Sequence, residues 1–380
     1  MKILFLIFHG FEKHNGISKK IHYQMEAFKE CNAEVHLCYF TDQAGRKCRW
    51  MDNDILNDYG QGFKAKILKR TAFGDIVKYV RQENISMVYV RHDHNANPFT
   101  IHLLKQLQAT GAKIVLEIPT YPYDQEYRGF PLSDRFYLLI DKCFRRQMAH
   151  YVDKIVTFSN HKTIWGKPTI QLSNGIDFSS IKLKKQFNTT DKELHLIGVA
   201  EVHYWHGFDR IMSGLTEYYH TNPSYKVYFH IIGNTGEKDR KVMQEIISAG
   251  KIESYVLFHG AMHGEELDAF FDKTDMGIGS LGRHRSGITN IKTLKNREYA
   301  ARGIPFVYSE TDSDFDSQSY VLKVPADEST VSITKIINFY QSRQWQPQEI
   351  RNSVRELSWQ KQMKKVLDAV IPLNKKTAAK

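Results

Sequence analysis

The sequence predicts an α/β protein made of two doubly wound domains, and three observations support this prediction. Short apolar runs typical of buried strands alternate with amphipathic helical segments from the first residue onward. The alternation stops in a polar stretch near residues 178–192 and then begins again. The length of 380 residues exceeds that of one typical core and suits two domains. Nearly continuous apolar strands joined by helices are typical of parallel sheets covered on both faces.

The first domain is predicted over residues 1–180. Its strands are expected at the apolar runs 2–8, 33–40, 87–92, 113–119, 154–159 and 169–177, and its helices at 15–32, 73–83, 98–111 and 133–150. The run at 2–8 lacks the small-residue cleavage site of a signal peptide, so a buried first strand is the better interpretation. The charged stretch from about residue 41 to 70 shows no clear period and is expected to be rich in loops.

The second domain is predicted over residues 190–352. Its strands are expected at 194–200, 225–233, 255–260, 276–281, 305–309 and 319–325, and its helices at 207–221, 237–250, 264–274 and 294–303. Two such domains would bring the carboxyl ends of both sheets to one cleft, where ligands of doubly wound folds bind. Neither domain contains a G-x-G-x-x-G or a Walker A motif, which argues against a dehydrogenase and a P-loop enzyme.

Composition restricts the class of protein further. Hydrophobic residues make up 42% and charged residues 25%, as in ordinary globular proteins. No run of about 18 apolar residues predicts a transmembrane helix. The four cysteines show neither metal-ligand nor disulfide spacing, which suits the cytoplasm. The net charge of +11 indicates an anionic partner, and the basic, partly apolar segment 62–82 fits either a solvated helix face or peripheral association with an anionic membrane.

Several short motifs follow one another in a definite order. They are "NGISKKIHYQMEAF", "IQLSNGIDFS", "LIGVAEVHYWHGFDRIMSGL", "FHIIGNTGE", "VLFHGAMHGEELDAFFDKTDMGIGS", "LKNREYAARGIPFV" and "LSWQKQMKKVL". Each motif is weak alone, but their common order resembles the retaining GT-B glycosyltransferases of the group 1 type, as in bacterial polysaccharide biosynthesis. The resemblance implies a GT-B fold with two Rossmann-like domains, and a final helix within 353–375 that crosses back to the first domain.

The same resemblance implies a donor site in the second domain. Glu298 matches the family glutamate that accepts hydrogen bonds from the ribose hydroxyls of a nucleotide-sugar, a task suited to a carboxylate. Gly233, in the motif "FHIIGNTGE", falls among the expected donor residues. The alternative for Glu298 alone is an ordinary surface glutamate, and the motif order favours the functional interpretation.

This sequence departs from the family at three donor positions. A family glutamate that contacts the donor sugar falls at Asn290, and the arginine and lysine that hold the diphosphate fall at Glu201 and His206. The latter two changes remove fixed cations from a place where negative charge grows as the diphosphate leaves. Arg285 and Lys295 are therefore expected to replace them, with solvated loop cations as the alternative.

Candidate acceptor residues are expected in the first domain. The family histidine at the end of a central strand is absent, and Glu117 is the nearest titratable group, where a buried carboxylate would be costly unless it faced the cleft. Together with His92 it is the candidate catalytic group. Asp93 and His94 are expected to bind the acceptor, with plain loop structure as the alternative. Gly16 opens a helix after the first strand, where backbone amides can meet an anionic group.

No metal site and no cofactor are predicted. The His-Asp-His run at residues 92–94 lacks a distant third ligand, and the acidic stretch 312–316 is interpreted as a turn. The leading hypothesis is metal-independent transfer of a sugar from a nucleotide-sugar donor to a saccharide or lipid-linked acceptor, at the cytoplasmic face of the membrane and without a nucleic-acid partner. The alternatives are a GT-B-fold epimerase or phosphorylase, and a non-catalytic protein that binds anionic glycans or nucleic acid.

Overall fold

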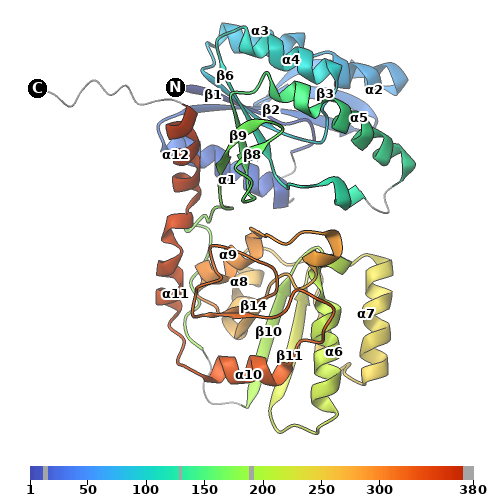
Figure 1. Cartoon of the computed structure of the whole chain (residues 1–380), viewed down its shortest axis with the longest axis vertical. Helices are drawn as coiled ribbons and strands as arrows, with labels where there is room; N and C mark the ends of the chain where they lie inside the picture. The colour runs from blue at the N-terminus through green and yellow to red at the C-terminus, as the bar shows by residue number, and fades with distance from the viewer. Residues whose placement is uncertain (12–15, 128–130, 188–191, 371–380) are drawn as a thin grey trace, which may run out of the picture. The chain divides into compact units, whose positions relative to one another are not determined.

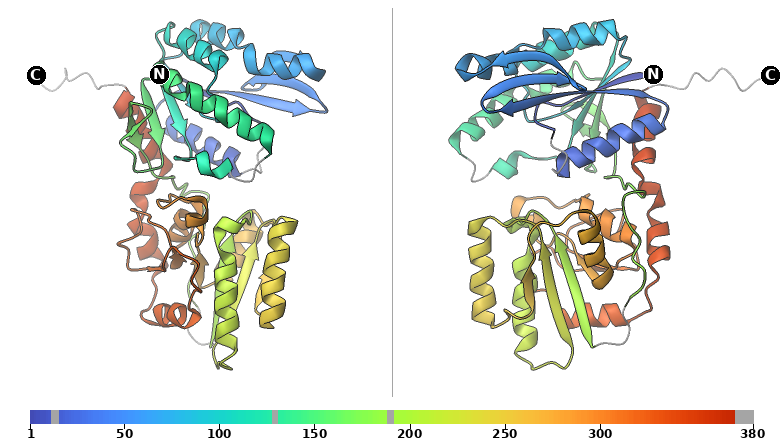
Figure 2. Two further views of the ribbon diagram at one scale, coloured as in Figure 1. Left: turned by 45° about the vertical axis from the view of Figure 1, so that its right-hand side comes forward. Right: turned by 180° about the vertical axis from the view of Figure 1, so that it is seen from behind.

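The computed structural model describes residues 1–11, 16–127, 131–187 and 192–370. The chain divides into two units (Figure 1), of which unit 1 comprises Met1–Ser173 and Trp359–Lys380 and unit 2 comprises Asn174–Ser358. Each unit contains one main sheet with its own hydrophobic core. In the views of Figure 2, helices flank the sheet of each unit.

Unit 1 is an α/β unit, in which η denotes a 3₁₀ helix. Its elements are β1 (Lys2–Leu6), α1 (Gly16–Glu30), β2 (Glu34–Gln43), β3 (Arg46–Met51), β4 (Asp54–Gly60), α2 (Gly62–Thr71), α3 (Gly74–Gln82), β5 (Met87–Arg91), α4 (Pro98–Gln108), β6 (Lys113–Ile118), η1 (Asp124–Tyr127), α5 (Leu132–Ala149), β7 (Lys154–Thr157), β8 (Thr163–Ile164), β9 (Lys167–Gln171) and α12 (Trp359–Val370). The strand order is β4-β3-β2-β1-β5-β6-β7-β9-β8.

The central strands β1, β5 and β6 of unit 1 are buried on both faces, as their continuous apolar runs predict. Leu4 and Leu6 of β1 belong to the core under α3, α4 and α5, whereas Ile3 and Phe5 belong to the core under α1 and α12. This two-residue alternation between faces is the geometry of a strand. The central pairs β1–β2, β1–β5, β5–β6, β6–β7 and β7–β9 are all parallel.

The stretch 41–61, expected to be rich in loops, instead forms an antiparallel extension of the sheet. β2 pairs with β3, and β3 pairs with β4. Ala44 and Gly45 turn the first hairpin with φ of 50° and 80°, the positive values that a tight two-residue turn requires. The prediction was wrong because β3 carries charged side chains that are nevertheless buried, Lys47 and Arg49.

Unit 2 has a six-stranded sheet, β12-β11-β10-β13-β14-β15, in which every neighbouring pair is parallel. Its elements are β10 (Glu193–Val199), η2 (Tyr204–His206), α6 (Phe208–Tyr219), β11 (Lys226–Ile232), α7 (Glu237–Gly250), β12 (Val256–Phe258), α8 (Gly264–Lys273), β13 (Met276–Ile278), η3 (Arg283–Ser286), α9 (Leu294–Arg302), β14 (Phe306–Tyr308), β15 (Val321–Lys323), α10 (Ile333–Gln341), α11 (Pro347–Ser353) and η4 (Arg355–Leu357). The repeated strand–helix order predicted this unit well.

Candidate active site

The loops after the strands of unit 2 share one edge of its sheet because the strands are parallel. Three of them are central to the site: 200–207 after β10, 233–236 after β11 and 279–293 after β13. Ligands of doubly wound sheets bind outside the carboxyl ends of the strands. This edge is therefore the candidate donor site.

Two glycines allow these loops to pack closely. Gly233 has φ of 126°, and a Cβ there would lie 1.8 Å from the carbonyl oxygen of Ala200. Gly207 has φ of 68°, and its Cβ would lie 2.7 Å from the carbonyl carbon of Leu281. Only glycine accommodates both the positive φ and the contact. The role of Gly233 in the structure is thus steric, because the absence of a side chain lets the loop after β11 pack against the loop after β10.

Lys295, in the first turn of α9, is a shielded cation without a hydrogen-bond partner among the described residues. Its ammonium nitrogen lies 5.4 Å from the ring centroid of Phe208. Burial and the positive charge of Arg283 lower the pKa of Lys295 to about 7, while Glu310 acts against them. An ammonium group held dry and unpaired gains strongly from an anion placed beside it. The structure thus leaves Lys295 available for the role that the sequence predicts.

His206 lies close to Lys295 and is 7% exposed. Burial, followed by the charges of Lys295 and Arg283, lowers its pKa well below the usual value, so the imidazole is neutral. The backbone N–H of His203 donates to Nδ1 of His206 at 3.0 Å. Nδ1 therefore carries no proton and Nε2 does, which makes His206 a neutral donor and not a replacement cation.

Arg285 does not fit the clamp that the sequence predicts. Its Nη1 and Nη2 donate to the two carboxylate oxygens of Asp209 at 2.9 and 2.7 Å, and Nη2 and Nε also donate to Glu328. Nη1 donates further to the backbone oxygen of Tyr204 at 2.7 Å. A guanidinium held by two carboxylates has little charge left for a ligand. The structure assigns Arg285 to fixing η3 against η2 and α6.

Glu298 lies three residues after Lys295 on α9, so the two side chains share one face of the helix. Its Oε1 accepts from Nε and Nη2 of Arg302 at 3.0 and 2.9 Å, and Arg302 also donates to Asp268 at 2.7 Å. Oε2 of Glu298 makes no hydrogen bond within the described part of the chain, and the side chain is 29% exposed. This carboxylate is oriented by Arg302 and keeps one oxygen for a ligand.

Two other predicted donor residues lie in surface loops. Asn290 is exposed next to Thr311, with which it forms an isolated β-bridge, and Glu201 is exposed in the loop after β10. Sequence reasoning missed Glu310, whose 2%-exposed carboxylate accepts from the backbone N–H of His284 at 3.1 Å and from the hydroxyl of Ser309 at 2.8 Å. Glu310 follows β14 at the same sheet edge. Its position just after a predicted strand is the signal by which the sequence could have identified it.

In unit 1, Glu117 is fully buried, whereas the sequence predicted that it would face a cleft. Arg91 donates to it at 2.5 Å, Tyr89 at 2.7 Å and Gln24 at 2.6 Å, and the Lys20 ammonium lies at 3.5 Å. Burial alone would raise its pKa, but Lys20 and Arg91 hold the pKa of Glu117 below its usual value. Such a carboxylate is a structural anion that orients its neighbours, not an accessible base.

His92 is also buried, with 3% of its surface exposed. Its Nε2 lies 3.3 Å from a carboxylate oxygen of Asp141 on α5, and Tyr123 donates to the other oxygen at 2.5 Å. His92 therefore ties the end of β5 to α5, and the structure does not expose it to a substrate. This geometry speaks against the catalytic role that the sequence predicted for it.

Asp93 and His94 follow β5 and line a cavity of unit 1. Asp93 is exposed, yet the protein around it raises its pKa by desolvation, against the charges of His9 and His92. Burial lowers the pKa of His94 to about 4, and its ring stacks on Tyr123 with centroids 3.9 Å apart.

Gly16 is the first residue of α1, and the preceding residues 12–15 of the expected glycine loop lie outside the described residues.

Basic side chains form ion pairs with the carboxylates of the acidic turn 312–316. Arg297 pairs with Asp312 at 2.6 Å, and Lys292 pairs with Asp314 at 2.9 Å. Over the residues that the structure describes, no cluster of three or more His, Cys, Asp or Glu side chains could hold a metal ion. None of the described helices is long and apolar enough to span a membrane.

Comparison with known proteins identifies the fold. No family model and no curated protein sequence matches the chain. Among solved structures, sucrose-phosphate synthase of Thermosynechococcus elongatus is 12% identical with a TM-score of 0.66, covering 97% of this chain and 98% of that one. Anabaena HepE in complex with UDP is 13% identical with a TM-score of 0.64, covering 98% and 100%.

A third similar structure is the pneumococcal O-GlcNAc transferase GtfA in complex with UDP and GlcNAc. It is 11% identical with a TM-score of 0.60, and the match covers 97% of this chain and 98% of the other. These matches span both units and nearly the full length of each chain. The protein therefore has the GT-B fold of these glycosyltransferase structures.

Proposed function

We propose that the protein is a glycosyltransferase that moves a sugar from a nucleotide-sugar to a saccharide or lipid-linked acceptor. The observation that carries this proposal is that two groups lie on one face of α9. They are the shielded, unpaired ammonium of Lys295 and the carboxylate of Glu298, of which one oxygen accepts no hydrogen bond from a described residue. A cation beside a ribose-binding carboxylate is the arrangement that a nucleoside diphosphate requires. It lies at the ligand-binding edge of a doubly wound sheet.

In the proposed reaction, the bond between the anomeric carbon and the diphosphate oxygen breaks, and its electron pair leaves with the diphosphate. Lys295 stabilises the charge that develops there, with Nε2–H of His206 as a neutral donor. The acceptor oxygen forms the new bond to the anomeric carbon and passes its proton to a phosphate oxygen of the leaving group. This course gives retention of configuration, as in the family that the motifs resemble.

Three further parts of the proposal concern the substrates and the place of action. UDP is the favoured nucleotide because HepE and GtfA were solved with it. Activity is proposed to need no divalent metal, since Lys295 supplies the compensating charge. The basic helix α2 supports peripheral association with the inner face of the cytoplasmic membrane and a part in cell-surface polysaccharide synthesis.

A nucleotide titration followed by a turnover assay tests the proposal. UDP, GDP and ADP are titrated against the whole chain by thermal shift, since a ligand bound to the native state raises Tm. Nucleotide-sugars are then screened for release of nucleotide in the presence of membrane extract. Binding with release supports transfer, and binding with conversion of the donor sugar alone indicates an epimerase. Phosphate-dependent release would point to a phosphorylase, and no response to any nucleotide would point to a non-catalytic binding protein.

A further inference from the structure

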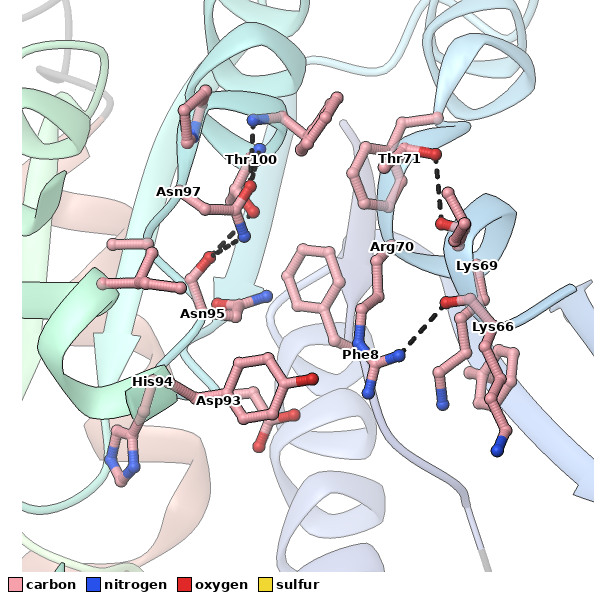
Figure 3. A pocket seen from close by; sticks show the side chains of 18 of the residues that line it. Phe8, Lys66, Lys69, Arg70, Thr71, Asp93, His94, Asn95, Asn97 and Thr100 are labelled. Carbon is pink, nitrogen blue, oxygen red and sulfur yellow. Dashed lines mark hydrogen bonds between the residues drawn. The ribbon is translucent and has the colours of Figure 1, made fainter. Parts of the chain in front are cut away.

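Unit 1 contains a cavity of about 820 Å³. It lies between α2, α4, α5 and the loop that follows β5, and Figure 3 shows its side chains. Small-molecule sites in proteins have volumes of about 300 to 1,000 Å³. The cavity therefore has the size of a site for one ligand molecule.

One part of the cavity wall is apolar and open to solvent. Phe63 and Ile67 on α2 are 77% and 46% exposed, Phe99 on α4 is 52% exposed and Tyr137 on α5 is 51% exposed. Large apolar side chains exposed singly are common, but a group of them from three helices around one cavity marks a binding surface. Such a surface favours a ligand with a hydrocarbon part.

A second part of the wall is basic. Lys66, Lys69 and Arg70 line the cavity, and none of them pairs within 4.0 Å with a carboxylate that the structure describes. Arg70 donates to the backbone oxygen of Lys66 at 3.1 Å and lies 5.6 Å from the ring centroid of Tyr137. These cations stand on the α2 face that also carries the exposed apolar residues, because positions three and four apart share a helix face.

A third part of the wall is the end of β5, with Asp93, His94 and Asn95. Asp93 and Asp134 are the carboxylates of the lining, and neither forms an ion pair with the basic side chains. The wall thus combines polar groups at the sheet edge with cations and exposed apolar side chains that alternate on one face of α2. A ligand that matches this combination carries a sugar, a phosphate and a hydrocarbon chain.

We propose that this cavity binds the acceptor as a lipid phosphate, with the phosphate on Lys66, Lys69 and Arg70 and the first part of the chain on Phe63 and Ile67. The inference rests on the proposed function and narrows its acceptor to a saccharide carried on a phosphorylated lipid. Contact with a flat anionic bilayer alone would use the exposed side chains but leave an 820 Å³ cavity unfilled.

The test measures binding of farnesyl phosphate to the whole chain by calorimetry, below the concentration at which the probe forms micelles. Farnesol and inorganic phosphate serve as the two half-ligands. We expect farnesyl phosphate to bind at least about tenfold more tightly than either half, since each half loses one set of contacts. Equal binding of farnesol and farnesyl phosphate would overturn the role of the cations.

Matched variants separate the cavity from the rest of the surface. The double change Lys66→Ser with Arg70→Ser and the double change Phe63→Ser with Ile67→Ser should each weaken farnesyl phosphate binding by at least about tenfold. Lys64→Ser on α2 and Leu139→Ser on α5 change exposed residues outside the cavity lining and should leave it unchanged. All of these side chains are solvent-exposed, so the variants should fold.

Two outcomes contradict the inference in distinguishable ways. If the chain binds phosphatidylglycerol vesicles but not farnesyl phosphate, and Lys64→Ser weakens vesicle binding as much as Lys66→Ser does, the surface only contacts membranes. UDP binding is measured on the same preparation. UDP binding without farnesyl phosphate binding overturns this inference alone, whereas loss of both overturns the proposed function as well.

Discussion

Arg285 donates two hydrogen bonds to the carboxylate of Asp209, at 2.9 Å from Nη1 to Oδ1 and 2.7 Å from Nη2 to Oδ2. This bidentate pair joins η3, which follows β13, to α6, which follows β10. The loops on which the candidate donor site depends are thereby fixed to each other. The pair is the physical reason that Arg285, although basic and correctly placed in the sequence, is not free to hold a diphosphate.

A double-mutant cycle tests this role of Arg285. We expect Arg285→Ala and Asp209→Ala each to lower the free energy of unfolding by about 1–3 kcal/mol, because each leaves a partly buried charge without its partner. The double variant should cost less than the sum. Chemical denaturation measures all four proteins. Strict additivity would show that the pair contributes nothing of its own.

Lys295→Met should weaken UDP binding by about tenfold or more, because it removes the cation facing the diphosphate. The pKa of Lys295 is about 7, so at pH 8 the free protein holds this group mostly neutral. A bound diphosphate favours the ammonium form and raises the pKa, so binding should take up close to about one proton per UDP. The nucleotide itself, with a last phosphate pKa of about 6, contributes little at pH 8.

Calorimetry at pH 8 in two buffers of different ionisation enthalpy measures the proton uptake. Lys292→Met is the matched control, because the ammonium of Lys292 is already paired with Asp314 at 2.9 Å. It should keep the uptake that Lys295→Met loses. Equal uptake in all three proteins would remove Lys295 from the diphosphate site.

Glu298→Gln should weaken the binding of UDP by about 1.5–3 kcal/mol, which is the free energy that hydrogen bonds to a charged acceptor contribute. The wild type should therefore distinguish UDP from 2′,3′-dideoxy-UDP, while the variant should bind both nearly alike. Because Glu298 also accepts from Arg302, the Tm of the variant is compared with that of the wild type. A variant that keeps full discrimination between the two nucleotides contradicts the ribose assignment.

Glu117→Gln should lower the free energy of unfolding by about 3–5 kcal/mol, because it leaves Lys20 and Arg91 buried without their anion. Adding Lys20→Met should recover part of the loss. The pKa of Glu117 is lowered by folding, so its contribution is present above the unfolded value of 4.5 and is lost as pH falls through the folded pKa. Thermal unfolding of the single and double variants from pH 3 to 7 checks both statements.

The sequence allowed the parallel sheets to be predicted because their strands are apolar on both faces and their helices are amphipathic. β3 and β4 could not be predicted in the same way, since Arg49 is a buried charge. It donates to the backbone oxygen of Lys69 at 3.2 Å and to the hydroxyl of Tyr59 at 3.4 Å, and both partners come from later in the chain. When the hydrogen-bond partners of a buried charged residue lie elsewhere in the chain, the sequence around that residue resembles a solvent-exposed segment.

The same limit applies to the candidate site. The positions of Glu298 and Lys295 on one helix face follow from their spacing, which the sequence shows directly. The pairing of Arg285 with Asp209, and of Glu117 with Lys20, joins residues far apart in the chain. Which charges remain free for a ligand is therefore decided by tertiary contacts, and only the structure separates Lys295 from Arg285.

Release of nucleoside diphosphate from nucleotide-sugars by the purified chain with membrane extract tests the proposed sugar transfer most directly. We expect at least one donor, most simply a UDP-sugar, to be consumed in an acceptor-dependent manner. Release should fall sharply in Lys295→Met and Glu298→Gln but persist in Lys292→Met. If no nucleotide-sugar is turned over or bound, or if these three variants behave alike, the protein does not transfer sugar through Lys295 and Glu298.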